Sequence, residues 1–291
     1  MILGDGVRRN ISTVSEEEQI RFRNAILKLH QDKFYPDGVS HWFKQDQIHQ
    51  ATHVHGGPAF LPWHRNLLNK FEELLRKVEP EISLHYWDWT QDPANINLLG
   101  PYGLMGASHG MLKSPFDILH NKGIFAGSRD ETQNPVDPPQ SVTRDLNMSI
   151  QFPVDEFIVD IADSEDEVNQ WHLFRLELED WHNNAHGVIG GNLLSGHRSF
   201  EDPFVFLLHS NIDRIWAKWQ LKPGKDWRRD AEKIYGFESD HPQLNEILEP
   251  WGGGVTDPTQ KIRPWGSDFP AETVTSKDLY IINKVPEYDT N

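Results

Sequence analysis

The sequence predicts a mainly α-helical protein, and three observations support this fold class. Apolar residues recur at helical spacing in several long segments. Segments with the pattern of a strand are few, and residues 82–87 and 279–282 are the best candidates. Between residues 88 and 155 the chain is rich in Pro, Gly and Asn and shows little periodicity, which predicts long connecting loops.

The first two helices are predicted from a capping signal and an apolar stripe. Ser15 followed by three glutamates forms a capping box, so the first helix begins there. A second helix is predicted over residues 60–78, where apolar residues form one stripe that also includes His64. Pro80 follows this helix and stops it.

Two further helices are predicted in the second half of the chain. Helical periodicity resumes at Glu165 and continues through His182 until Gly187 and the pair Gly190-Gly191. The last strong helix starts at Asp202-Pro203 and carries His209 among apolar neighbours.

Composition limits the kind of protein and the chemistry. The 291 residues contain no Ser/Gly-rich linker or repeat, which favours one domain over residues 1–291. The formal net charge of -16 argues against nucleic-acid or anionic-membrane partners. No long apolar run or secretion leader is visible, so we expect a soluble chain that is cytoplasmic or exported with a partner. The absence of cysteine leaves histidine and carboxylate to bind any metal.

Histidines on the predicted helices suggest such a metal site. His182 and His186 are four residues apart, so both rings emerge on one helix face and can bind one ion, with His209 placed to supply a third ligand. His55, in a loop, and His64 form a further group with His41 upstream. The alternative reading is a helical domain whose histidines lie in the core or bind zinc.

Two stretches resemble the copper-site signatures of tyrosinases, and the resemblance covers residues 41–219. The first contains His55, Phe60, Leu61, Trp63, His64, Arg65, Leu68 and Glu72. The second contains Asp202, Pro203, His209, Asn211, Asp213, Arg214 and Trp216. His182 and His186 precede the second stretch at the family's usual distance, and residues 7–10 are similar to the N-terminal stretch of bacterial members.

The resemblance implies a four-helix bundle that holds two copper ions, with dioxygen as co-substrate. One copper would be bound by His41, His55 and His64, and the other by His182, His186 and His209. The spacing from the first ligand to the second varies in the family, so His49 and His53 compete with His41.

Further residues receive roles from the same resemblance. Glu179, with the adjacent Asn183, resembles a pair that orients a basic water for deprotonating the phenol, and Glu177 is the alternative. Asp213 would either pair with Arg214 in the bundle or orient a ligand imidazole. Arg8 and Tyr280 resemble a structural pair that joins the chain ends.

The sequence departs from the family pattern at several positions. Leu208 stands where many members carry a histidine, and Val205 stands where the signature has phenylalanine. We expect the residues after 219 to close the core rather than to form a shielding domain. Gly187 directly follows His186, and Gly196 stands where a bulkier residue often overhangs the site, so we expect an open entrance that admits bulky phenols.

The expected activity is ortho-hydroxylation of monophenols and oxidation of o-diphenols to o-quinones, as in a tyrosinase of melanin formation. The alternatives are a catechol oxidase or o-aminophenol oxidase without the hydroxylation step, and a hemocyanin-like oxygen carrier. The expected partners are small phenols and, as in some bacterial relatives, a small protein that delivers copper.

Overall fold

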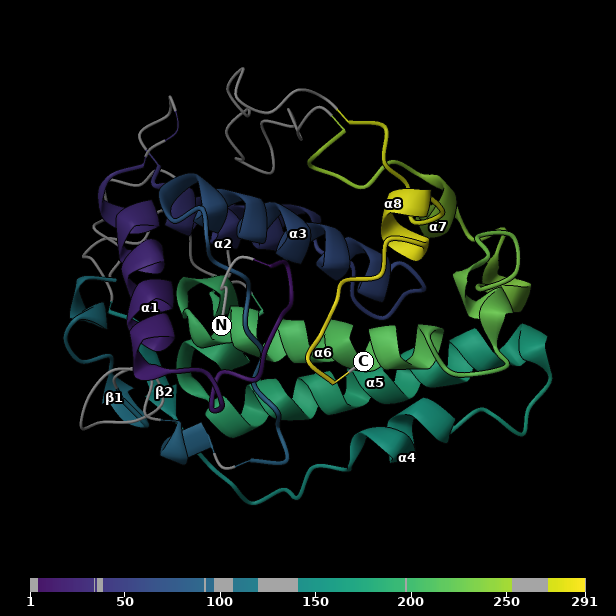
Figure 1. Cartoon of the computed structure of the whole chain (residues 1–291), viewed down its shortest axis with the longest axis horizontal. Coiled ribbons are helices and arrows are strands. Elements are labelled where there is room, and N and C mark those ends of the chain that lie inside the picture. Colours follow the sequence, from purple (N-terminus) through teal and green to yellow (C-terminus); the bar gives the residue numbers. More distant parts are fainter. Residues whose placement is uncertain are drawn as a thin grey trace.

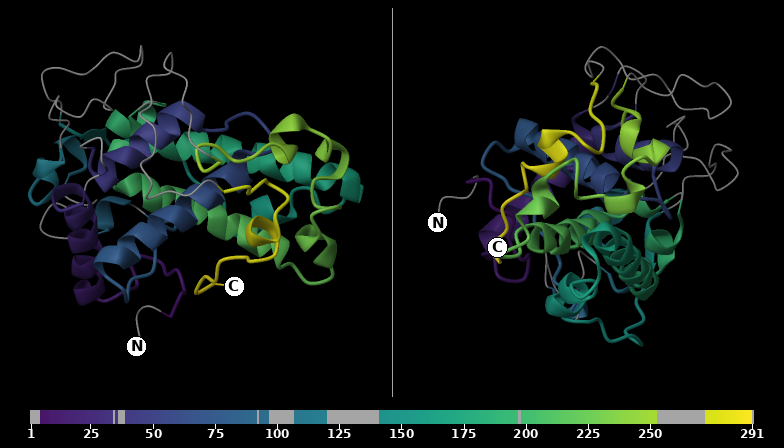
Figure 2. Two further views of the ribbon diagram at one scale, coloured as in Figure 1. Left: turned by 90° about the horizontal axis from the view of Figure 1, so that it is seen from above. Right: turned by 90° about the vertical axis from the view of Figure 1, so that its right-hand side faces the viewer.

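The protein is mainly α-helical, as the sequence predicts, and four helices form a bundle. The computed structural model describes residues 5–33, 35, 39–91, 93–96, 107–119, 141–196, 198–252 and 272–290. The bundle helices are α2 (His41–Thr52), α3 (Phe60–Val78), α5 (Glu167–Ile189) and α6 (Phe204–Gln220). In Figure 1, α5 and α6 run side by side beneath α3, and Figure 2 shows the same arrangement from two further directions.

Two other helices pack on the outside of this bundle. Helix α1 (Glu16–Gln31) contacts α2 and α3, and it stands across one end of the molecule in Figure 1. The hydroxyl of Ser15 accepts a hydrogen bond from the Glu18 backbone N–H, which confirms the predicted start. The short helix α4 (Asp155–Asp160) packs against α5 and α6. None of the helices described is both long and apolar enough to cross a membrane.

The remaining described elements are short. A two-stranded antiparallel sheet pairs β1 (His109–Met111) with β2 (Thr143–Asp145). The short helices are η1 (Pro93–Asn95), η3 (Phe116–Ile118), η4 (Gly191–Leu194), η5 (Ser199–Glu201), η6 (Asp226–Arg229), η7 (Gly236–Glu238), α7 (Pro242–Asn245) and α8 (Leu279–Ile282). The predicted connecting region thus holds short elements where it is described; residues 92, 97–106 and 120–140 lie outside the described residues.

Both predicted strands are wrong. Residues 279–282 form α8, because a four-residue apolar run carries too little periodicity to separate helix from strand. Residues 82–87 belong to no sheet, and their backbone pairs with another segment only through an isolated β-bridge between Tyr86 and Asn10 in the part of the chain that is described.

The pair Gly190-Gly191 ends α5 where the sequence predicts. Both residues have positive φ, 67° and 58°, a conformation that other residues rarely adopt. A Cβ on either glycine would also overlap the β2 backbone, at Asp145 or Thr143. The two glycines therefore let the chain turn directly after Ile189, one helical turn beyond His186, and bring η4 against the sheet.

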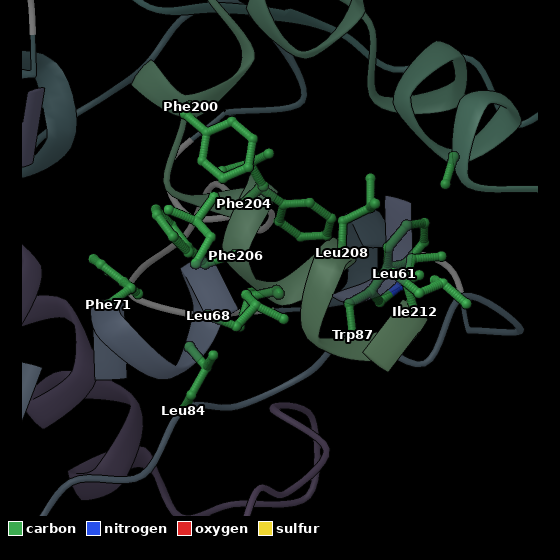
Figure 3. Close-up of a cluster of buried hydrophobic side chains, with 14 of the residues drawn as sticks. Leu61, Leu68, Phe71, Leu84, Trp87, Phe200, Phe204, Phe206, Leu208 and Ile212 are labelled. Atoms are coloured by element: carbon green, nitrogen blue, oxygen red, sulfur yellow. The ribbon is translucent and has the colours of Figure 1, made fainter. Parts of the chain in front are cut away.

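The core between α3 and α6 is apolar and aromatic. Figure 3 shows side chains from both helices and from the extended segment 82–87 in one cluster. Phe71 on α3 stacks on Phe206 on α6, with ring centroids 3.5 Å apart. Val205 and Leu208, where the sequence departs from the family pattern, are fully buried in this core.

Helix α2 was not predicted, because its sequence lacks an apolar stripe. Ser40 caps its N-terminus by accepting from the Phe43 backbone N–H. Most of its polar residues are buried, including Lys44, Asp46 and His49. Apolar residues form a stripe at helical spacing when the opposite face of the helix is polar and exposed. A helix that is buried on nearly all sides gives no such signal.

A buried ionic cluster fixes α3 against α6. The Asp213 carboxylate accepts from Arg65 Nε at 2.5 Å, from Arg8 Nη1 at 3.0 Å and from the Tyr288 hydroxyl at 2.7 Å. The Arg65 guanidinium also lies over the Trp216 ring, 3.4 Å from its centroid. Asp213 therefore has a structural role and contacts no imidazole in the described interactions.

Two predicted pairings are corrected by the structure. Arg214 does not pair with the adjacent Asp213 but makes a two-pronged ion pair with Asp155 at the start of α4, at 2.5 and 2.8 Å. The tyrosine that meets Arg8 is Tyr288 and not Tyr280. Adjacent residues on a helix point about 100° apart, so partners come from other elements.

Candidate metal centre

Three histidines from α5 and α6 converge on one point. His182 and His186 lie one turn apart on α5, and His209 faces them from α6. The Nε2 atom of His209 is 3.2 Å from Nε2 of His182 and 3.1 Å from Nε2 of His186. We call these residues the second triad; the sequence predicts all three together.

A second group of three histidines lies beside this one. His49 from α2, His55 from the α2–α3 loop and His64 from α3 place one ring nitrogen each within 4.8 Å of one another. His49 and His64 are buried, whereas His55 is exposed. We call these residues the first triad.

The structure does not bring His41 into the first triad, and His49 occupies the predicted place of His41. His41 is the first residue of α2, where its backbone N–H donates to Lys33 and its ring lies 4.2 Å from the Tyr35 ring. Eight residues separate His41 from His49, about 12 Å along a helix. The prediction therefore failed because residues 41–52 form a helix that the sequence pattern does not reveal.

In two of the candidate ligands, a hydrogen bond from Nδ1 fixes the proton on that nitrogen and leaves Nε2 with a lone pair that can bind a metal. A carbonyl only accepts, so Nδ1 of His64 donates to Phe60 O at 2.8 Å and Nδ1 of His186 donates to Leu193 O at 2.6 Å. Nε2 of each ring must then carry a lone pair. Nε2 of His64 is buried without a hydrogen-bond partner among the described residues. Converging lone pairs fit a bound cation, so the residues present suit a metal ion.

The rings of both triads are held neutral by their surroundings. Desolvation, with charge repulsion from neighbouring histidines, lowers the pKa of His49, His64, His182 and His209 well below the usual value. Desolvation lowers the pKa of His186 to about 4 and that of His55 to about 3. Neutral imidazole is the form that binds a metal, so the triads are ready at neutral pH.

The two triads are close enough to form one binuclear centre. The rings of His64 and His209 stack with centroids 4.6 Å apart, and the rings of His55 and His182 lie 5.7 Å apart. Because each triad contributes one of these stacked rings, two bound ions would be neighbours. Such a pair of ions can act together on one small molecule.

The two predicted catalytic residues lie beside the triads on α5. The buried carboxylate of Glu179 accepts from the Gly56 backbone N–H at 2.6 Å, directly after His55, and its Oε2 has no hydrogen-bond partner among the described residues. Burial raises the pKa of Glu179. Asn183 Oδ1 lies 3.1 Å from His182 Nδ1. The alternative, Glu177, accepts from the Trp181 indole N–H.

A pocket of about 220 Å³ leads to the triads. Its lining consists of His49, His55, His182, Asn183, His186, Leu193, Leu194, Ser195, Gly196 and Ser199. Leu194 is 66% exposed and forms part of the rim. A Cβ built on Gly187 or Gly196 meets no described atom within 4 Å, in agreement with an open entrance.

Comparisons with known proteins agree with this site. The family model for the common central domain of tyrosinase matches residues 31–222. A tyrosinase of Streptomyces antibioticus is 30% identical, covering 84% of this chain and 92% of that protein. Grixazone synthase of Streptomyces griseus is 28% identical, covering 84% of this chain and 93% of that protein.

The fold is also similar to that of a functional unit of octopus hemocyanin, with a TM-score of 0.59 and 21% identity over 97% of this chain and 68% of that one. The match of the family model to most of the chain, the homology over most of the tyrosinase length and the two histidine triads agree with one another. The chain belongs to the tyrosinase family.

Proposed function

We propose that the protein hydroxylates monophenols at the ortho position and oxidises o-diphenols to o-quinones with dioxygen. One copper ion would be held by His49, His55 and His64, and the other by His182, His186 and His209. The observation that carries this proposal is the pair of adjoining triads at the base of an open pocket. When bound, the two copper ions supply the redox chemistry for the reduction of dioxygen.

The donor set favours copper over a zinc site. All six candidate ligands are neutral imidazoles, which suit both Cu(I) and Cu(II). A structural zinc site is usually closed by four ligands, whereas each triad offers three and two rings of each line the pocket. A position open to a small molecule at each ion fits an oxidase.

The chain's own residues would bind the phenol and accept its proton. Leu193 and Leu194 give the pocket an apolar side on which an aromatic ring can lie. A phenol has a pKa of about 10, so it must lose its proton before its oxygen binds a metal. Glu179 would take that proton through a water molecule on Oε2, which has no hydrogen-bond partner among the described residues, and Asn183 would orient the His182 ring.

The single-domain organisation over residues 1–291 is part of this proposal. One hydrophobic cluster extends from Ile11 to Ile282 and includes residues of all four bundle helices. The arginine–aspartate cluster around Asp213 also joins residues near both chain ends. Delivery of copper by a small accessory protein is compatible with the exposed position of His55.

The test is oxygen uptake by copper-reconstituted protein, offered a monophenol such as tyrosine in one cell and the matching catechol in another. Uptake with both substrates supports the proposal. Uptake with the catechol alone would reassign the protein as a catechol oxidase or o-aminophenol oxidase. Reversible oxygen binding without turnover would instead indicate a carrier like hemocyanin.

A further inference from the structure

A seventh histidine, His53, lies next to the first triad without belonging to it. Its ring stacks on that of His49, with centroids 4.7 Å apart, and lies 4.6 Å from the ring of His55. Nδ1 of His53 donates to the backbone carbonyl of His49 at 2.6 Å. Because the carbonyl only accepts, Nε2 of His53 carries a lone pair that can bind a metal ion.

The rings of His55, His53 and His49 form a continuous series from the surface to the interior. His55 is exposed, His53 is half-buried, and His49 is 2% exposed. His49 also lies 5.8 Å from the ring of the buried His64. An ion bound at the outer end of this series can therefore reach the inner ligands by short steps between neighbouring rings.

Within this series, His53 lies outside the lining of the substrate pocket. The pocket is lined by His49 and His55, but His53 is not among its lining residues. Two imidazole nitrogens that share an ion, each about 2 Å from it, lie at most about 4 Å apart. The ring centroids of His53 and His55 are 4.6 Å apart, so one nitrogen of each ring can come within this distance when the exposed His55 ring turns toward His53.

We propose that His53 and His55 form an outer binding site for Cu(I), from which the ion passes to His49 and His64. The proposal rests on the proposed function, since it presumes that the first triad holds copper. Each step exchanges one neutral imidazole for another on the same ion, so the oxidation state stays Cu(I) and no electron is transferred. In the finished site His53 is displaced, and the ion keeps His55, His49 and His64.

The test measures the rate at which the metal-free protein takes up copper without oxygen. Cu(I) is supplied as its coloured bicinchoninate complex, and loss of that colour reports transfer to the protein. The key variants are His53→Leu and His53→Met, which are similar in size and both remove the hydrogen bond to His49. They differ in that the methionine thioether binds Cu(I) and leucine does not.

We expect His53→Leu to take up copper about tenfold more slowly than the wild type, which is the smaller end of the effects seen when a residue that supports a metal site is lost. We expect His53→Met to take up copper at nearly the wild-type rate. Both variants should reach the final copper content of the wild type. The exposed His109 on β1 gives a control, since His109→Leu should load normally.

Three outcomes would overturn the loading role: a His53→Leu rate equal to wild type, equal slowing in both His53 variants, or similar slowing in His109→Leu. Equal slowing in both His53 variants would mean that the hydrogen bond to His49, and not copper binding, is what matters. Failure of the proposed function gives separate results: without a copper site the wild-type protein would not take up two copper ions, and with a site that only binds oxygen the copper would load but no phenol would be oxidised.

Discussion

The imidazole rings of His64 and His209 stack across the contact between α3 and α6, with centroids 4.6 Å apart and planes 14° from parallel. Each ring belongs to a different triad, so the distance between the two candidate metal positions depends on the packing of these two helices. Arg65 follows His64 directly, and its partner Asp213 lies one turn after His209. The same ion pair that joins α3 to α6 therefore positions one ligand of each triad.

His49, and not His41, is expected to be required for oxidation. His49→Ala removes a buried member of the first triad and should abolish oxygen uptake with both monophenol and catechol. His41→Ala alters a ring about 12 Å away along α2 and should retain most of the activity. The measurement is oxygen uptake at equal protein and copper concentrations. Full activity in His49→Ala, or its complete loss in His41→Ala, would contradict the corrected ligand set.

Glu179→Gln is expected to slow phenol hydroxylation more than catechol oxidation. The substitution keeps the size of the side chain and an oxygen that can accept from the Gly56 N–H, but it removes the basic carboxylate. A positioned general base contributes about 10² to 10⁴-fold to rate. Steady-state kcat/KM for both substrates measures the difference, with Glu177→Gln as a control, because the Glu177 carboxylate accepts from the Trp181 indole N–H and not from the loop that carries His55. An equal loss on both substrates would remove the proton-accepting role.

Breaking the buried cluster at Asp213 is expected to destabilise the fold strongly. Asp213→Ala leaves the buried guanidinium groups of Arg8 and Arg65 without this carboxylate, which costs about 3 to 5 kcal/mol. Asp5→Ala, which breaks the more exposed pair with Arg9, should change stability by less than about 1 kcal/mol. Urea unfolding of the metal-free proteins measures both. Similar small effects in the two variants would show that Asp213 is not essential to the contact between α3 and α6.

The metal-free protein is expected to lose stability as the pH falls below about 6.5. Burial lowers the pKa of His182 and His209 in the folded state, so below pH 6.5 the unfolded chain binds protons that the folded chain does not. The free energy of unfolding then decreases as the pH falls, by up to about 1.4 kcal/mol per pH unit for each such ring. Above pH 6.5 these rings are neutral in both states and the dependence disappears.

Urea midpoints between pH 7.5 and 5 measure this dependence. His209→Leu removes one buried ring and should reduce the slope below pH 6.5 by about one proton. A stability that stays constant from pH 7.5 to 5, or an unchanged slope in the variant, would show that the rings are not held neutral by the fold.

The helices that carry four of the six candidate ligands were predictable from local patterns, and the sequence also placed His55 in a loop. Helices α3, α5 and α6 have apolar stripes and clear ends, such as Gly190-Gly191, so the sequence places their histidines on inward faces. The ligand on α2, His49, was assigned to His41 instead, because α2 buries polar residues and lacks an apolar stripe. The polar side chains at residues 44–50 are recognised as buried only when the tertiary structure is known. The sequence alone therefore does not show that these residues form a helix of the bundle.

The long-range pairings could not be predicted from the sequence for a related reason. Arg214 is adjacent to Asp213, but its ion-pair partner is Asp155, 59 residues away. Arg8 meets Tyr288, which follows α8, rather than Tyr280, which lies within α8. Charge pairing at such separations depends on how helices pack, which no local pattern specifies.

The most direct test of the central claim, that two adjoining histidine triads hold two copper ions, is the copper content of reconstituted protein. We expect two copper ions per chain in the wild type, one in His64→Ala or His182→Ala, and none in the double variant. Two copper ions in either single variant, or one in the wild type, would contradict the binuclear centre.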